Sequence, residues 1–386
     1  MRIAIATEVF LPKIDGITNR LRSTIEELTR LGHEVLVFAP TGAVAEHAGA
    51  RVVRVPGAPF PPYPGLRVSA PDPRIAWELA RFAPHVVHAV GPACLGIWAS
   101  LAARSLRIPL VASYHTDLPR YLAGYRLSFA KPVIWPLLRA IHGLAHVNLC
   151  PSSFTRDELH AHGIEPVELW RGGVDTARFS PAKRSLEMRL RLAGGAPDGP
   201  IVLSVGRISP EKNLGLFARV LEAIPEARVA FVGDGPARPA LERRLRGKRA
   251  SFLGFLEGDD LAAAFASADV FLMPSRTETL GFVVLEAMAS GCPVVAARAG
   301  GIPDLVAHEE SGLLYDPERE EEAIASIRGL LEDDGRRLFL ARMARKRAEE
   351  SSWPAETRRL LQAYRTAIVL QRTQGMLGRL RRMVFA

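Results

Sequence analysis

Residues 270–288 read VFLMPSRTETLGFVVLEAM, and they contain, in order, a strand, a turn and the beginning of a helix. The apolar run Val270–Met273 has the length of a strand and stops at Pro274. After Gly281 the apolar residues recur at helical spacing, and Gly291 ends that pattern. A helix that begins just after a strand offers unpaired backbone N–H groups and the positive end of its dipole. Both favour a bound phosphate.

Two carboxylates flank this turn. Glu278 and Glu286 are eight residues apart, a rise of about 12 Å if the segment were wholly helical. That is wider than the roughly 5–9.5 Å between the paired carboxylates of a glycosidase. The spacing suits the two ends of an extended ligand with a diphosphate in the middle. The alternative is that both residues only flank a buried amphipathic helix.

Short apolar runs alternate with helical segments along most of the chain, which predicts βαβ units and parallel sheets covered by helices. A stretch rich in Gly and Pro interrupts the pattern before residue 201. We therefore expect an α/β protein with a domain at 1–180, a linker at 181–200, a second domain at 201–350, and a helix and tail at 351–386. Two such domains leave a cleft at the carboxyl ends of both sheets, where ligands bind in open α/β folds. Strands are expected near 2–7, 33–39, 51–55, 85–90, 110–115, 146–150, 167–170, 201–206, 228–233, 251–255, 270–274, 293–297 and 313–315, with a helix at about 19–31.

The composition is that of a soluble globular protein, with 48% hydrophobic and 24% charged residues in 386 positions, enough for two domains. The 3 cysteines lack CxxC spacing, so they indicate neither a disulfide framework nor a zinc site. The chain opens without a secretory signal, and charged residues and prolines interrupt its most apolar later region, 129–150. These features predict a cytoplasmic protein.

The net charge of +9 is concentrated at one end of the chain. Residues 336–386 hold 13 Lys/Arg and 3 Asp/Glu, interleaved with bulky aliphatic residues. Cationic amphipathic helices of this kind lie on anionic membrane surfaces, so we expect a peripheral protein on the inner face of the plasma membrane. For 336–365 a solvated helix face that packs on the body of the protein is an equal alternative, whereas for 376–386 the membrane interpretation is favoured. Nucleic acid is disfavoured as a partner, because stacking aromatic residues do not accompany the charges.

Further candidate residues follow other predicted strands. Arg207 and Lys212 come directly after the strand 201–206, where two cations suit a leaving diphosphate. An Asp-x-Asp triplet does not occur, so a divalent metal ion has no obvious carboxylate site. We therefore expect metal-independent chemistry without a cofactor. A surface ion pair is the alternative role for the charges in this segment.

Three weaker signals lie at other strand ends. Gly16 precedes a helix and permits close approach of a ligand, although such a glycine is more often only part of a turn. His115 ends the strand 110–115, where it either faces a ligand or is structural. The motif Gly233-Asp234-Gly235-Pro236 is only a partial dinucleotide signal, and its proline argues against the usual fingerprint.

In this order the motifs Gly206-Arg207, Glu211-Lys212-Asn213, Gly233-Asp234-Gly235-Pro236 and Glu278-x₇-Glu286 resemble the retaining glycosyltransferases of family 4. The resemblance extends from Met1 to about Tyr364 and implies the GT-B fold, in which two Rossmann-like doubly wound domains face a cleft. It implies that Arg207 and Lys212 bind the donor diphosphate and that Glu286 binds the ribose. It also implies contacts to the donor sugar and phosphate from Glu278, Thr279, Leu280 and Gly281, to the base from backbone near Leu256, and to the reacting centre from His115. Gly16 is expected to approach the donor.

Within this family the chain is most similar to the bacterial sulfoquinovosyltransferases. The segments 10–17, 185–189 and 275–281 carry that resemblance, which implies transfer of sulfoquinovose from UDP-sulfoquinovose to diacylglycerol. Arg20, assisted by Lys13 and His115, is the predicted sulfonate-binding group, since a fixed anion calls for a fixed cation. Asp117 instead resembles the family's mannosyltransferases. A lipid glycosyltransferase using GDP-mannose or UDP-glucose, a nucleotide-sugar 2-epimerase and a non-catalytic membrane adaptor therefore remain alternatives.

Overall fold

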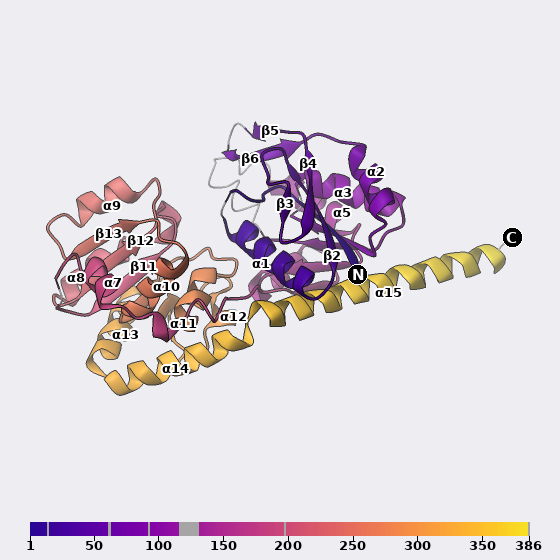
Figure 1. Ribbon diagram of the computed structural model, residues 1–386. Coiled ribbons are helices and arrows are strands. Elements are labelled where there is room, and N and C mark those ends of the chain that lie inside the picture. Colours follow the sequence, from indigo (N-terminus) through magenta and orange to yellow (C-terminus); the bar gives the residue numbers. More distant parts are fainter. Residues whose placement is uncertain (14, 61–62, 92, 116–130, 197, 385–386) are drawn as a thin grey trace. The chain divides into compact units, whose positions relative to one another are not determined.

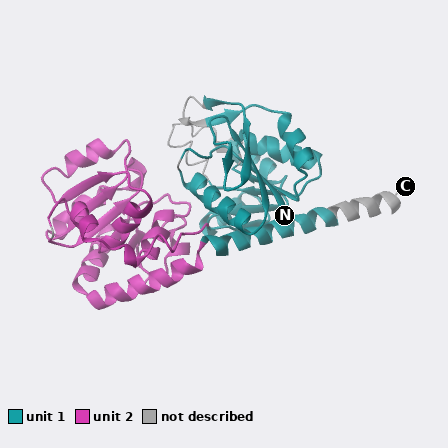
Figure 2. Cartoon of the chain, in the orientation of Figure 1, with its two compact units in different colours: residues 1–171, 353–386 teal, residues 172–352 magenta. Residues whose placement is uncertain are grey.

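The computed structural model describes residues 1–13, 15–60, 63–91, 93–115, 131–196 and 198–384 (Figure 1). The chain forms two compact units (Figure 2). Unit 1 consists of residues 1–171 and 353–386, and unit 2 consists of residues 172–352. Each is an α/β unit built on a largely parallel sheet, as the alternating sequence pattern predicts.

The sheet of unit 1 has eight strands in the order β10-β9-β8-β7-β1-β2-β4-β3, and only the β3–β4 pair is antiparallel. The order reverses on either side of β1, which pairs in parallel with both β2 and β7. A separate hairpin, β5–β6, was not expected from the sequence. The strands are β1 (Arg2–Thr7), β2 (Glu34–Pro40), β3 (Glu46–His47), β4 (Ala50–Val55), β5 (Gly57–Phe60), β6 (Tyr63–Ser69), β7 (Val86–Val90), β8 (Leu110–Ser113), β9 (Val147–Cys150) and β10 (Val167–Leu169).

The sheet of unit 2 has six parallel strands in the order β13-β12-β11-β14-β15-β16. Counted along the chain this is 3-2-1-4-5-6, the doubly wound order of dinucleotide-binding folds, in which ligands bind where the order reverses. The reversal lies between β11 and β14, which are neighbours in the sheet. The strands are β11 (Ile201–Val205), β12 (Arg228–Val232), β13 (Ala250–Gly254), β14 (Val270–Met273), β15 (Val294–Ala297) and β16 (Leu313–Tyr315).

Helices cover the sheets because the strands are apolar on both faces. Alternate residues of β11 show this: Ile201 and Leu203 enter one buried cluster, while Val202 enters another. In unit 1, Ile3 and Ala4 of β1 divide between two clusters in the same way. The helices of unit 1 are α1 (Gly16–Arg30), α2 (Arg74–Phe82), α3 (Cys94–Ser105), α5 (Lys131–His142), α6 (Ser153–Ala161) and α15 (Trp353–Val384). Those of unit 2 are η2 (Pro181–Lys183), α7 (Leu186–Leu192), η3 (Pro210–Lys212), α8 (Leu216–Ala223), α9 (Arg238–Arg244), α10 (Gly258–Ser267), α11 (Phe282–Ala289), α12 (Ile302–Leu305), α13 (Glu320–Glu332) and α14 (Asp334–Glu350).

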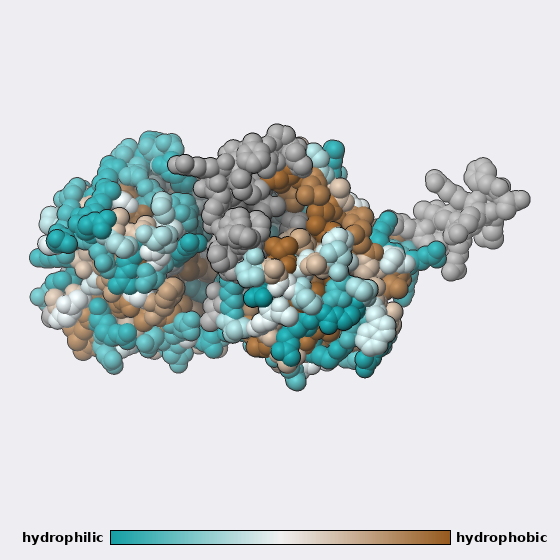
Figure 3. Space-filling model, turned by 90° about the horizontal axis from the view of Figure 1, so that it is seen from above, coloured by the Kyte–Doolittle hydropathy of each residue, from teal (hydrophilic) through white to brown (hydrophobic). Residues whose placement is uncertain are grey.

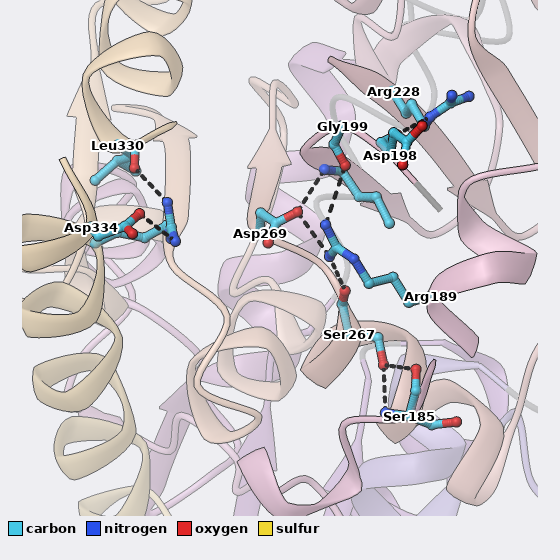
Figure 4. A network of polar contacts seen from close by, with 11 residues as sticks. Ser185, Arg189, Asp198, Gly199, Arg228, Ser267, Asp269, Leu330 and Asp334 are labelled. Carbon is cyan, nitrogen blue, oxygen red and sulfur yellow. Dashed lines mark hydrogen bonds and ion pairs between the residues drawn. The ribbon is translucent and has the colours of Figure 1, made fainter. Parts of the chain in front are cut away.

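The segment expected to be a linker, 181–200, is instead part of unit 2. Arg189 of α7 donates hydrogen bonds to the carbonyl oxygens of Ser267 (3.0 Å) and Gly199 (3.2 Å) and pairs with Asp269 at 2.9 Å (Figure 4). Met188 and Leu192 of the same helix enter a buried cluster of unit 2. The chain therefore passes from unit 1 to unit 2 at residue 171, earlier than expected.

The basic C-terminal segment is also largely part of the folded body. Leu340 and Ala344 of α14 are buried in unit 2, and α14 packs on α11. Leu360 and Tyr364 of α15 are buried in the core of unit 1, and α15 packs on α1. Packing on the body, one of the two alternatives for 336–365, therefore applies to one side of these helices, while Leu338, Phe339 and Val369 are exposed. The side chains of 374–386 lie outside the described residues.

Candidate functional site

Unit 2 has a pocket at the point where its strand order reverses. The pocket has a volume of about 130 Å³ and opens at the carboxyl ends of β11 and β14. Both strands are largely buried; Gly206 follows β11, and Pro274 follows β14. The pocket is lined by Ser204, Val205, Gly206, Arg207, Lys212, Leu214, Met273, Pro274, Glu278, Gly281, Phe282 and Val283.

Three charged side chains line this pocket, and all three were predicted from the sequence. Arg207 is exposed beside it, on the loop that follows β11. Lys212 ends η3 and forms an ion pair with Glu278, which comes from the loop after β14. Their side chains are only 23% and 14% exposed, so the pair is partly shielded from water. A diphosphate entering the pocket would compete with Glu278 for the Lys212 ammonium.

The N-terminus of α11 closes another side of the pocket. Gly281 is its N-cap with φ = 94°, a left-handed conformation that favours glycine, and a Cβ there would lie 2.7 Å from Ile302 Cδ1. The neighbouring Leu280 is 2% exposed, which fixes the turn against the core. The first backbone N–H groups of a helix have no intrahelical acceptor, so this end of α11 favours an anion.

The remaining residues predicted to bind the donor lie outside the pocket lining. Glu286 lies within α11, where its side chain is half-buried, and removal of its carboxyl from water raises the pKa of that carboxyl to about 7. Thr279 is half-buried on the loop before α11. Leu256 follows β13 and packs partly against a buried cluster. All three belong to unit 2, but the described contacts do not join them to Arg207 and Lys212.

Sequence reasoning missed the glycine pair that holds the Glu278 loop. The Gly301 N–H donates to the Glu278 carbonyl oxygen at 2.8 Å. Gly300 has φ = 56°, and a Cβ there would lie 2.2 Å from the same oxygen. The pair could have been found from its place after the strand 293–297 and before a helix.

In unit 1, His115 lies just after β8 and is buried at 8% exposure. Its ring packs edge-on against Trp170, with centroids 5.3 Å apart. Within the described residues, neither ring nitrogen has a hydrogen-bond partner. Burial, with a smaller contribution from the nearby Arg20 charge, lowers the pKa of His115 well below its ordinary value, so the ring is neutral. Trp170 was not singled out in the sequence.

The structure gives Arg20 a role that conflicts with sulfonate recognition. Its guanidinium is 2% exposed and donates to the carbonyl oxygens of Trp170 (2.7 Å) and Arg171 (2.8 Å). It also lies over the Trp170 ring, 4.7 Å from the centroid. The sequence could not reveal this, because the contact joins residues 150 positions apart. Arg20 therefore holds the end of unit 1 together at the point where the chain leaves it.

The other residues expected near the donor in unit 1 lie at the start of α1. Asp15 caps this helix by accepting from the Thr18 N–H at 2.8 Å, which places Gly16 in its first turn. Lys13 pairs with Asp15 at 3.4 Å, and its side chain is 34% exposed. Asp117 lies outside the described residues.

The described residues contain neither a cluster of metal-binding side chains nor a helix suited to span a membrane. Groups of three or more His, Cys, Asp or Glu side chains that could hold a metal ion were not found there. In the same part of the chain, none of the helices is both long and apolar enough to cross a membrane.

Comparison with known proteins connects the two units to one family. The family model for Glycosyltransferase Family 4 matches residues 14–178, and the model for Glycosyl transferases group 1 matches residues 199–333. The sulfoquinovosyl transferase SQD2 of Arabidopsis thaliana is 42% identical over 90% of this chain and 70% of its own. A GDP-mannose-dependent alpha-mannosyltransferase of Mycolicibacterium smegmatis is 40% identical over 95% of this chain and 98% of its own. The chain belongs to glycosyltransferase family 4. It is a glycosyltransferase, as the motifs predicted.

Two further matches give fold and context. The structure of Anabaena Alr3699/HepE in complex with UDP has a TM-score of 0.77 at 21% identity and covers 94% of this chain and 99% of that one. This likeness confirms the GT-B fold with its two Rossmann-like domains. The alpha-monoglucosyldiacylglycerol synthase of Streptococcus pneumoniae is 29% identical over 82% of this chain and 75% of its own.

Proposed function

We propose that this family 4 glycosyltransferase moves sulfoquinovose from UDP-sulfoquinovose to diacylglycerol and retains the α configuration. One observation carries the donor part of the proposal: two cations and a helix N-terminus converge on the pocket at the strand-order reversal of unit 2. This set suits a nucleoside diphosphate. The identity to the sulfoquinovosyl transferase SQD2 supports the sugar, and the likeness to an alpha-monoglucosyldiacylglycerol synthase supports a diacylglycerol acceptor.

The chemistry that we propose depends on charge developing at the leaving group. As the bond between the sugar C1 and the diphosphate oxygen breaks, negative charge grows on the diphosphate. Arg207, Lys212 and the first amides of α11 stabilise that charge more in the transition state than in the ground state. The acceptor hydroxyl attacks C1 from the same face, and its proton passes to the departing phosphate oxygen. A metal ion or cofactor is not required in this scheme.

The lipid acceptor is supported by the surface of unit 1. Large apolar side chains are exposed on its helices, and Figure 3 shows a hydrophobic patch on this unit. The exposed apolar side chains include Trp77 of α2, Leu101 of α3 and Leu137 of α5, with Leu106 directly after α3. A peripheral position on the inner face of the plasma membrane, with an anionic lipid surface as partner, accords with such a surface and with the chain's basic end.

A GDP-mannose-dependent transferase is the second candidate. It is favoured by the 40% identity to a mannosyltransferase that this chain covers almost completely. Arg20 donates to the carbonyl oxygens of Trp170 and Arg171, so its place in the sequence does not by itself favour a sulfonated sugar over mannose.

The two candidates are separated by incubating the protein with diacylglycerol and one of three donors, UDP-sulfoquinovose, UDP-glucose or GDP-mannose. The proposal predicts a glycolipid product with UDP-sulfoquinovose and little with the others. A product with GDP-mannose alone would establish the second candidate. Donor turnover without an acceptor would instead indicate an epimerase.

A further inference from the structure

The motif Gly233-Asp234-Gly235 directly follows β12. In the sheet, β12 lies between β11, which leads to the pocket, and the edge strand β13. The motif is not part of the pocket lining. Its backbone instead contacts the loop that carries Arg207. We call residues 233–235 the glycine clasp.

Hydrogen bonds join the clasp region to both residues that flank Arg207. The Gly206 N–H donates to the Val232 carbonyl oxygen at 2.9 Å, and the Ile208 N–H donates to the Asp234 carbonyl oxygen at 3.0 Å. The Ile208 carbonyl oxygen in turn accepts from the Ala237 N–H at 3.0 Å. Arg207 is thus held from both sides through its backbone while its side chain is exposed beside the pocket.

The contact is too close for any residue with a Cβ. At Gly233, where φ is 124°, a Cβ would lie 2.1 Å from the Gly206 carbonyl oxygen. At Gly235 a Cβ would lie 2.4 Å from the Ile208 carbonyl oxygen and 2.9 Å from its carbonyl carbon. These obstacles are backbone atoms, so an added methyl group would have to move the Arg207 loop itself.

The clasp is also fixed in its own position. The Gly233 N–H donates to the Gly254 carbonyl oxygen at 2.7 Å, which attaches the clasp to the end of β13. Asp234 accepts from the Gly235 N–H at 2.7 Å with one carboxylate oxygen, while the other lies 3.1 Å from Arg238 Nη1. The Arg207 loop therefore rests on a support with several independent contacts.

We propose that the glycine clasp is a positioning element for donor binding: Gly235 and Asp234 fix the backbone of Arg207 so that its guanidinium meets the donor diphosphate. The inference rests on the proposed donor site in unit 2. The clasp sequence resembles a dinucleotide-binding turn, but in this proposal the clasp positions a phosphate-binding cation and does not bind the nucleotide itself. Misplacement of such a group by about 1 Å is enough to weaken its action greatly.

The test measures binding of UDP and GDP by calorimetry, and then continues with the nucleotide that the wild-type protein binds. The variants are Arg207→Ala, Gly235→Ala, the double variant, and Gly329→Ala. The last is a matched control, because a Cβ at Gly329 in α13 has nothing within 4 Å. Thermal unfolding of each variant shows whether it is folded.

The inference predicts that Arg207→Ala weakens binding on the order of 30-fold or more, as loss of a charged contact does. Gly235→Ala should weaken it about 10-fold, and the double variant should stay within about threefold of Arg207→Ala, because both changes remove the same contact. Gly329→Ala should bind as the wild type does.

The possible failures are distinct. Unchanged binding by Arg207→Ala would refute the proposed donor site itself. A loss with Arg207→Ala but none with Gly235→Ala, or losses that multiply in the double variant, would refute only the positioning role of the clasp. If Gly235→Ala does not fold, Asp234→Ala replaces it, since that change adds no atom against Ile208. Asp234→Ala should weaken nucleotide binding severalfold in the wild-type background but add little when combined with Arg207→Ala. If it weakens binding equally in both backgrounds, the inference is overturned.

Discussion

Replacing Arg20 with alanine tests whether this side chain supports the fold or contacts the donor. Its guanidinium is 2% exposed and donates to two carbonyl oxygens, at 2.7 and 2.8 Å, while lying over Trp170. Hydrogen bonds to charged groups contribute about 1.5–3 kcal/mol each, and removal of a buried charge that leaves its partners unpaired costs about 3–5 kcal/mol. Because each kcal/mol lowers the unfolding midpoint of a unit this size by about 2–4 °C, we expect a fall of roughly 6–20 °C.

The assay combines thermal unfolding with initial rates at a temperature where the variant is folded. Arg54→Ala is the matched control, because Arg54 is exposed and such a change shifts stability by only about 0.5 kcal/mol. The remaining activity of Arg20→Ala should fall equally with every donor that the wild type uses. A midpoint within about 2 °C of wild type, together with a selective loss of UDP-sulfoquinovose use, would refute this reasoning and restore the sulfonate-binding prediction.

Three further outcomes are expected. Lys212→Ala should lower turnover on the order of 10²-fold or more with little change in unfolding midpoint. Wild-type activity should survive EDTA. Activity that is lost in EDTA and restored by magnesium would contradict metal-independent catalysis. The full chain should co-sediment with anionic vesicles more than with neutral ones, less so at high salt and less when 374–386 are deleted, whereas equal binding to both vesicle types would reject the electrostatic contribution. The pKa of Glu286 is raised to about 7, so this carboxyl contributes stability below its unfolded pKa of 4.5 and loses that contribution as pH rises through about 7. The stability of Glu286→Gln should therefore rise relative to that of the wild type from about pH 5 to pH 8. A stability difference that does not vary with pH would show that burial does not destabilise the ionised carboxyl.

The sequence predicted the features that depend on local pattern. The strand expected at 2–7 is Arg2–Thr7, and the strand expected at 313–315 is Leu313–Tyr315, because buried parallel strands are short apolar runs between turn residues. The glycine turns and cations of the pocket were also visible, since each follows such a strand.

Features that depend on distant contacts could not be predicted. Arg20 near the start of α1 suggested a ligand contact, but its partners are Trp170 and Arg171, where the chain passes from unit 1 to unit 2. The basic segment around Tyr364 left open whether the helix lies on a membrane or packs on the protein; that side chain is buried, and its hydroxyl lies 2.8 Å from His88 Nδ1. In both cases the sequence shows which residues are charged, but only the tertiary packing of unit 1 shows what the side chains contact.

A competition between donors tests the central claim most directly. The wild-type protein is given equal concentrations of UDP-sulfoquinovose and GDP-mannose with diacylglycerol, and the lipid products are identified by mass. We expect a sulfoquinovosyl lipid as the main product, and Lys212→Ala should form on the order of 10²-fold less of it. A mannosyl lipid as the main product would contradict the proposed donor.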